Sequence, residues 1–202
     1  MMLILIAIVT TGAYHLTQQA DICYYKGHDL FVKSKYKEAV PFFLKSLSHE
    51  PHRPQTLTEL AFAYLWSGKH QEAVPVFQEL LSLEPDNIRI RKSLARAYSW
   101  SKEYVKAEAL FLEVVRANEN DRDSQKALAE VYLWDSKFGK AKTILTALLR
   151  ADPRDARAKF LYGKALLYSG QTKEAAGVFE ELLRNSQKAA GEKACRRFFL
   201  DF

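Results

Sequence analysis

The sequence has few of the residues on which catalytic and metal sites depend. It contains 202 residues, of which only two are cysteines and eight are glycines. The five histidines share no metal-ligand spacing with each other or with cysteine, and His49 and His52 flank a proline that marks a helix end rather than a zinc-binding helix. No glycine-rich phosphate loop, nucleophile elbow or paired-carboxylate motif occurs. We therefore predict that the protein is not an enzyme and needs neither cofactor nor metal ion.

Long runs of one charge are also missing. The net charge is +6 and the pI is near 9.2, which favours an acidic partner. The 24 acidic residues are nevertheless spread along the chain. This even distribution of both signs argues against nucleic acid as the partner.

The sequence does contain a spacing of 34 residues that recurs along most of the chain. At the same place in each period a small residue is followed, four residues later, by a large apolar one, which is a packing rule. Helix-ending residues return at the same interval. The small residues are Ala39, Ala73, Ala107, Ala141 and Ala175; the large ones are Phe43, Phe77, Phe111, Leu145 and Phe179; the helix ends are Pro51, Pro85 and Pro153, with Glu119 in the unit that breaks the rule.

These residues resemble the tetratricopeptide repeat (TPR) family, whose period is 34 residues. The second unit shows the pattern as Leu57, Leu60, Ala61, Tyr64, Ala73, Phe77 and Pro85. The fifth unit departs from the pattern at Tyr162, where a leucine is usual. The resemblance implies an all-α fold, an α-solenoid of antiparallel helix pairs in a right-handed superhelix with a concave groove that holds a peptide or a partner's tail. It covers five units: 20–53, 54–87, 88–121, 122–155 and 156–189.

Each unit is expected to form two short helices joined by a short loop. Ser67-Gly68 should break the first helix of the second unit, and Glu84-Pro85 and Asp152-Pro153 should end helices because a residue before proline is pushed away from helical geometry. Three acidic residues are placed to cap the helices that follow. They are Asp86, Asp121 and Asp155.

The two ends of the chain lie outside the repeats. Residues 1–13 are apolar and uncharged, so residues 1–19 read as a signal-like or membrane-anchoring segment. Thirteen helical residues span about 20 Å, short of the roughly 30 Å bilayer core. We expect an exported or membrane-anchored protein of the bacterial periplasm or envelope. The alternatives are a segment that covers the first helix pair, or a wrongly chosen start codon. Residues 190–202 read as a capping helix, or as a docking helix.

All three tryptophans fall at one place of the repeat. They are Trp66, Trp100 and Trp134, and Tyr168 stands there in the fifth unit. At 100° per residue Trp66 points away from the core residues of its helix. These rings are therefore expected to line the concave surface and to bind the partner. The alternative is that each ring packs against the first helix of the neighbouring unit.

Basic and aromatic residues precede the rings on the same helix faces. We predict partner binding by Phe62, Arg89, Lys92, Arg96, Lys126 and Lys164, because arginine grips carboxylates in a forked geometry and rings stack. Solvated surface charge is the alternative. The predicted groove positions are Gln55, Thr58 and Phe62; Arg89, Lys92 and Arg96; Asp123, Lys126 and Glu130; Arg157, Phe160 and Lys164.

Three functions fit these features. The first is a scaffold that holds an extended, acidic and apolar segment of a protein partner. The second is glycan binding or polysaccharide export, since the segments YLWSGKHQEA and YSWSKEYVKA are similar to repeats of bacterial envelope proteins that help export polysaccharide. The third is a cytoplasmic chaperone for secreted proteins.

Overall fold

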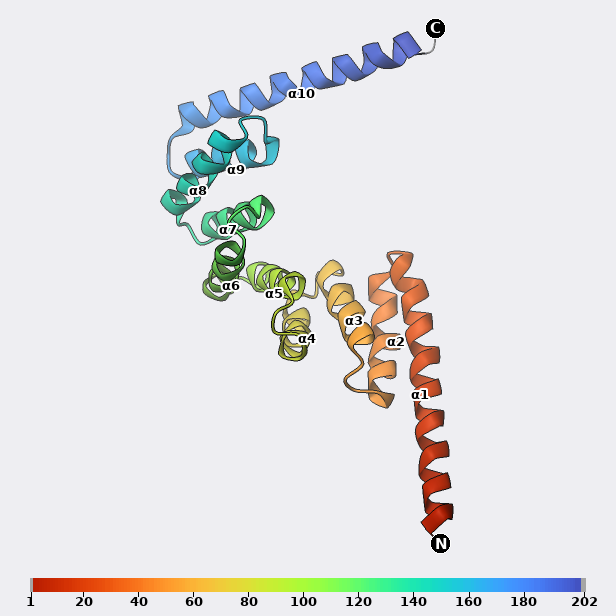
Figure 1. Ribbon diagram of the computed structural model, residues 1–202. Coiled ribbons are helices and arrows are strands. Elements are labelled where there is room, and N and C mark those ends of the chain that lie inside the picture. Colours follow the sequence, from red (N-terminus) through yellow and green to blue (C-terminus); the bar gives the residue numbers. More distant parts are fainter. Residues whose placement is uncertain (1, 201–202) are drawn as a thin grey trace. The chain divides into compact units, whose positions relative to one another are not determined.

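The computed structural model describes the backbone of residues 2–200 and the side chains of residues 16–187. Every element of that backbone is a helix, and the predicted all-α solenoid fold is confirmed (Figure 1). The chain divides into two compact units, residues 1–103 and residues 104–202. The helices are α1 (Met2–Val32), α2 (Tyr36–His49), α3 (Pro54–Trp66), α4 (His70–Leu83), α5 (Ile88–Trp100), α6 (Tyr104–Ala117), α7 (Arg122–Trp134), α8 (Phe138–Ala151), α9 (Ala156–Tyr168) and α10 (Thr172–Leu200).

Residues 1–103 form a row of helices in which each one packs against the next, from α1 to α5. The small-then-large pairs make the core, as the period predicts: Phe43 and Phe77 are fully buried, and so are Ala39 and Ala73. A fully buried phenylalanine contributes about 1.5–3 kcal/mol relative to an exposed one. The repeated pair therefore supplies similar packing energy to the α1–α2 hairpin and to the α3–α4 hairpin.

Residues 104–202 form a second row, from α6 to α10, with the same packing of each helix against the next. Phe111 and Leu145 hold the large position and are buried. The fifth unit has Gly163 where the middle units have alanine. A Cβ there would lie 2.7 Å from the ring of Phe179, so glycine lets that ring approach the α9 backbone closely.

The turn between the two helices of a unit has the same backbone geometry each time. One residue per turn adopts positive φ, and these residues follow one another at the repeat spacing. Two of them are glycine, for which this conformation carries no steric cost. They are Ser34 (φ 59°), Gly68 (83°), Lys102 (64°), Ser136 (57°) and Gly170 (82°).

The predicted helix ends are largely confirmed. The first helix of the second unit ends at Trp66, before Ser67 and Gly68. Asp121 and Asp155 cap α7 and α9, accepting hydrogen bonds from Ser124 N at 3.0 Å and Ala158 N at 2.9 Å. The prediction for Asp86 was wrong. Asn87 caps α5 instead, because its Oδ1 accepts from Ile90 N at 3.2 Å, while Asp86 is exposed.

The predicted borders of the repeat region fall within continuous helices, at residues 19/20 in α1 and 189/190 in α10. The side chains of residues 1–15 and 188–202 lie outside the described part of the chain. The signal or anchor role of residues 1–19 and the capping role of residues 190–202 therefore stay predictions. Among the described residues, no helix combines the length and the hydrophobicity needed to span a bilayer.

Candidate partner-binding surfaces

Four rings each end the first helix of a repeat, and we call them the ring ladder: Trp66, Trp100, Trp134 and Tyr168. Their exposed fractions are 50%, 42%, 40% and 50% in that order. None is enclosed in the core, so one side of each ring is open to a partner.

The other side of each ladder ring is packed. Each contacts the first residue of the second helix in the preceding repeat, and for Trp66 the packing alternative also holds, because its ring contacts the first helix of that repeat. Trp66 also contacts Phe31 of α1, with ring centroids 5.5 Å apart. The ring pairs are Tyr36–Trp66 at 5.1 Å, His70–Trp100 at 5.0 Å, Tyr104–Trp134 at 6.5 Å and Phe138–Tyr168 at 5.9 Å. The ladder therefore combines packing between repeats with exposure.

Sequence reasoning missed the partner rings. Tyr36, His70, Tyr104 and Phe138 also recur every 34 residues, and each stands 30 residues before its ladder ring. Thr172 takes that place in the fifth unit. A ring at one register position in four successive units was a signal that could have revealed the pairing.

An open pocket of about 520 Å³ lies beside Trp66. It is formed by the turn between α1 and α2 and by the end of α3. It presents an indole and a phenol together with two lysines, one glutamate and two hydroxyls. The lining residues are Ser34, Lys35, Tyr36, Lys37, Glu38, Trp66 and Ser67.

Phe62 connects the ladder to the basic face of α5, which we define as Arg89, Lys92 and Arg96. The Phe62 ring lies 5.1 Å from Trp66, and the guanidinium carbon of Arg89 lies 5.3 Å from its centroid. Arg89 and Arg96 are exposed and Lys92 is half-buried. The sequence of α5, IRIRKSLARAYSW, contains no acidic residue. The structure thus brings together Trp66, Phe62 and Arg89 of the predicted site.

The remaining predicted positions of α3 are less distinctive. Gln55 is exposed, and the Thr58 hydroxyl donates to Pro54 O at 2.7 Å. Glu59, one residue further on, joins α3 to α1: it accepts from the Tyr24 hydroxyl at 3.0 Å and lies 2.8 Å from His28 Nδ1. Burial, and next the charge of Glu59, raise the pKa of Tyr24 to about 12. His28 therefore belongs to a polar contact between helices.

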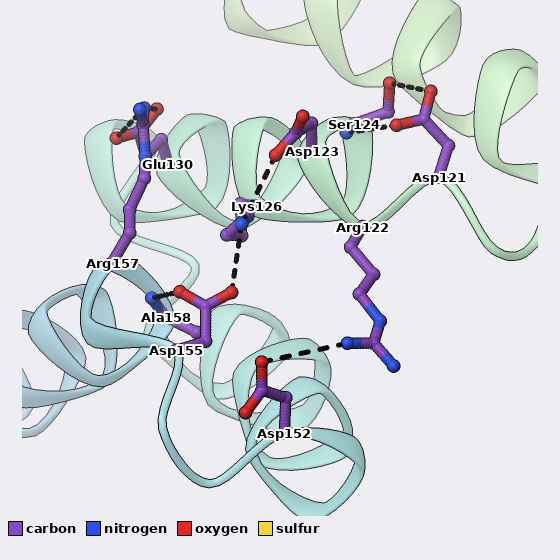
Figure 2. Close-up of polar contacts among 10 residues, drawn as sticks. All are labelled: Asp121, Arg122, Asp123, Ser124, Lys126, Glu130, Asp152, Asp155, Arg157 and Ala158. Carbon is purple, nitrogen blue, oxygen red and sulfur yellow. Dashed lines mark hydrogen bonds and ion pairs between the residues drawn. The ribbon is translucent and has the colours of Figure 1, made fainter.

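In residues 104–202 the predicted cation Lys126 is already bound within the chain (Figure 2). Its ammonium lies 2.9 Å from Asp155 and 3.3 Å from Asp123, and its side chain is only 14% exposed. The hydrogen bond to Asp155 raises the pKa of Lys126, although burial opposes this. A role for Lys126 in binding a partner's carboxylate stays a prediction, and such a carboxylate would have to compete with these two.

The other positions of this face are also engaged. Arg157 donates to both carboxylate oxygens of Glu130 at 3.0 Å (Figure 2). The Lys164 ammonium lies 5.9 Å from the ring centroid of Phe160 and 5.7 Å from that of Tyr168. Lys126 of α7 and Arg157 of α9 are thus paired with carboxylates of this face, whereas the sequence of α5 contains no acidic residue. Among the described side chains, no cluster of three or more His, Cys, Asp or Glu could hold a metal ion.

The tetratricopeptide repeat family matches residues 67–131 and residues 126–190. Together the two matches run from residue 67 to residue 190, more than half of the 202 residues. The chain belongs to the tetratricopeptide repeat family. No curated protein matches this TPR protein at a significant level.

Solved structures of low sequence identity share the fold. MamA (residues 41 to the end) from Desulfovibrio magneticus RS-1 is 20% identical with a TM-score of 0.72, over 84% of this chain and 96% of that one. A putative kinesin light chain with nearly identical TPR-like repeats from Podosopora anserina is 20% identical with a TM-score of 0.71, over 87% and 98%. TPR arrays present extended binding surfaces. This TPR protein is accordingly a scaffold for protein interaction.

Proposed function

We propose that this TPR protein is a non-enzymatic scaffold that holds an extended segment of its protein partner, and that this segment carries both carboxylates and apolar side chains. The observation that supports the proposal most is the cluster of Trp66, Phe62 and Arg89, in which a half-exposed indole, a second ring and an exposed guanidinium adjoin. Rings take up apolar side chains, and arginine pairs with carboxylates in a forked geometry.

The energetics require contacts with more than one repeat. Three aromatic contacts at about 1 kcal/mol each give about 3 kcal/mol, less than the roughly 4.1 kcal/mol of a millimolar complex. The basic face of α5 supplies the additional interactions, because hydrogen bonds to charged groups contribute about 1.5–3 kcal/mol each. An extended segment of about ten residues is about 33 Å long and reaches several first helices.

An array of synthetic acidic-apolar peptides tests this proposal. The wild-type chain is expected to bind a subset of these peptides. The triple substitution Arg89→Ala, Lys92→Ala and Arg96→Ala should weaken that binding at least about tenfold, which is the equivalent of one charge-assisted contact. A matched variant removes three cations elsewhere in residues 1–103. All three positions are exposed: Lys26 in α1, Lys33 in the turn after α1, and Lys45 in α2. Lys26→Ala, Lys33→Ala and Lys45→Ala together should leave affinity within about threefold.

Equal weakening in both triple variants would show that net charge alone attracts the peptides, and would remove the basic face from the proposal. Circular dichroism of both variants separates loss of binding from loss of fold. Because none of the six side chains is buried, both variants should keep the wild-type helix content.

We further propose that the protein works in the bacterial envelope, exported or anchored through its apolar beginning. The support is the uncharged stretch of residues 1–13. Fractionation of native cells, with the N-terminus of the mature protein read from the same sample, tests it. Recovery in the cytoplasm with residues 1–13 intact would favour a chaperone for secreted proteins instead.

Glycan binding is the second candidate, and the pocket beside Trp66 favours it. Indole faces stack on the apolar faces of sugar rings, while Lys35 and Lys37 could pair with sugar carboxylates. Titration of tryptophan fluorescence separates the two candidates. A shift with acidic oligosaccharides that is lost in Trp66→Ala, without a shift for any acidic-apolar peptide, would replace the peptide proposal with this one.

A further inference from the structure

A second open pocket, of about 530 Å³, lies on residues 104–202 and involves neither the ring ladder nor the basic face. We call it the α8 pocket. One stripe of α8 forms its wall, and α9 together with Gln171 completes it. Its volume falls in the range of about 300–1,000 Å³ that is usual for small-molecule sites. The lining residues are Gly139, Lys142, Thr143, Thr146, Ala147, Arg150, Tyr162, Leu166 and Gln171.

The α8 pocket is positively charged and rich in hydrogen-bond donors. Lys142 and Arg150 are its only charged lining residues, and none of the lining residues is acidic. No ion pair of either cation occurs among the described side chains. The hydroxyls of Thr146 and Tyr162 and the amide of Gln171 add neutral donors. An anion is the ligand that this combination recognises.

The same place one repeat earlier shows that this charge is a particular feature of the α8 pocket. There Glu108 accepts from Lys137 at 2.7 Å and from Lys140 at 3.1 Å, so acid and base neutralise each other. Thirty-four residues later the pair is Lys142 and Gln171, whose amide oxygen accepts from the ammonium at 2.7 Å. The amide positions the lysine without cancelling its charge.

Two further replacements point the same way. Ala147 stands where the second and third units have Glu79 and Glu113, so the acidic residue of that position is missing. Tyr162 stands where the middle units have a core leucine, and its phenol lines the pocket. Each replacement either removes a negative charge or adds a donor.

We propose that the α8 pocket binds a phosphate-bearing ligand. Lys142 and Arg150 are eight residues apart on one helix, about 12 Å along its axis, a span that two phosphoryl groups bridge better than one. Phosphoryl oxygens accept several hydrogen bonds at once, which suits the donors between the two cations. A diphosphate is therefore the preferred form. It comes either from a soluble organic phosphate or from a lipid headgroup.

Calorimetric titration of the full chain with inorganic pyrophosphate tests the proposal. Ala147→Glu introduces the acid that the second and third units have at this position, three residues before Arg150, where it pairs with that guanidinium and repels the ligand. Ala147→Gln has the same size without the charge. We expect Ala147→Glu to weaken pyrophosphate binding at least about tenfold and Ala147→Gln to change it by less than about threefold. Position 147 is exposed, so both variants should fold.

Two further measurements complete the test. Tyr162→Leu restores the family residue and should keep the fold while weakening binding several-fold. Vesicles of phosphatidylcholine with and without phosphatidic acid distinguish a lipid headgroup from a soluble phosphate. If the protein sediments with the acidic vesicles and Ala147→Glu does not, the ligand is a headgroup. If the protein binds pyrophosphate but neither kind of vesicle, the ligand is soluble. The proposal is overturned if neither probe binds saturably, or if Ala147→Glu binds pyrophosphate as the wild type does.

Discussion

Asp155 divides its carboxylate between Lys126, in the first helix of its own repeat, and the first helix of the next repeat, which it caps. Oδ2 accepts from Lys126 Nζ at 2.9 Å and Oδ1 accepts from Ala158 N at 2.9 Å (Figure 2). Burial alone would raise the pKa of this carboxyl, but the hydrogen bonds from Ala158 and Lys126 outweigh burial and hold it below its ordinary value. One side chain thus starts α9 and joins it to α7.

Removal of this carboxylate should destabilise residues 104–202. Asp155→Ala loses both the cap and the ion pair, and we expect a loss of about 2 kcal/mol in the free energy of unfolding. Asp155→Asn keeps a good cap and should lose about 1 kcal/mol. Asp123→Ala removes the exposed partner of Lys126 and should cost less than about 0.5 kcal/mol. Urea unfolding measures all three. Equal losses for Ala and Asn would contradict a separate role of the cap, and an unchanged stability in Asp155→Asn would contradict a role of the ion pair.

The same contact predicts the direction of a pH dependence. Because the pKa of Asp155 is lower in the folded chain than in the unfolded one, its contribution is present above the unfolded value of about 3.9 and is lost as the pH falls through the folded value. Between pH 5 and pH 2 the wild type should therefore lose more stability than Asp155→Asn. Parallel loss of stability in both proteins would exclude Asp155 as a contributor.

The positive-φ residue of each turn offers a stabilising substitution. Ser136 adopts φ 57° in the turn before α8, where Gly170 adopts φ 82° in the turn before α10. A non-glycine residue pays about 1 kcal/mol for this conformation. Ser136→Gly should raise the free energy of unfolding by a few tenths to about 1 kcal/mol, and Gly170→Ala should lower it by about 1 kcal/mol. A destabilised Ser136→Gly in thermal unfolding would mean that the serine side chain has a contact worth more than the strain.

The packing side of the ring ladder can be measured directly. Ring pairs contribute about 0.5–1.5 kcal/mol beyond burial, so a double-mutant cycle of Tyr36→Ala and Trp66→Ala should show a coupling energy in that range. The matched cycle pairs Tyr36→Ala with Trp100→Ala, whose ring partner is His70, and should be additive within about 0.5 kcal/mol. A coupling near zero in the first cycle would mean that the ladder rings do not join the repeats energetically.

The period predicted most of the fold because it carries packing information in every unit. The alanine and phenylalanine positions fixed which helix faces are buried, and the proline and Ser-Gly positions fixed where helices end. The cap of α5 was placed one residue too early because Asp86 and Asn87 are both good caps and only the backbone decides between them. Such one-residue choices depend on geometry that the pattern does not contain.

The candidate site was less predictable because its residues have two roles. Trp66 was expected on the surface, and it is half-exposed, but its contact with Tyr36 depends on how successive repeats stack. Lys126 was expected to face a partner, whereas a carboxylate 29 residues away in sequence already binds it. A helical projection shows which side chains share a face of one helix. It cannot show which of these side chains already contact residues of another helix.

Site-specific photocrosslinking in native cells tests the central proposal most directly. A photoreactive phenylalanine analogue at Thr58, which is four residues before Phe62 and eight before Trp66 on α3, is compared with the same analogue at Lys45 on α2. We predict that position 58 yields crosslinks to one protein, at a segment that combines carboxylates with apolar side chains, and that position 45 does not. The same crosslinked proteins in equal yield from both positions, or crosslinked segments without acidic residues, would contradict the account.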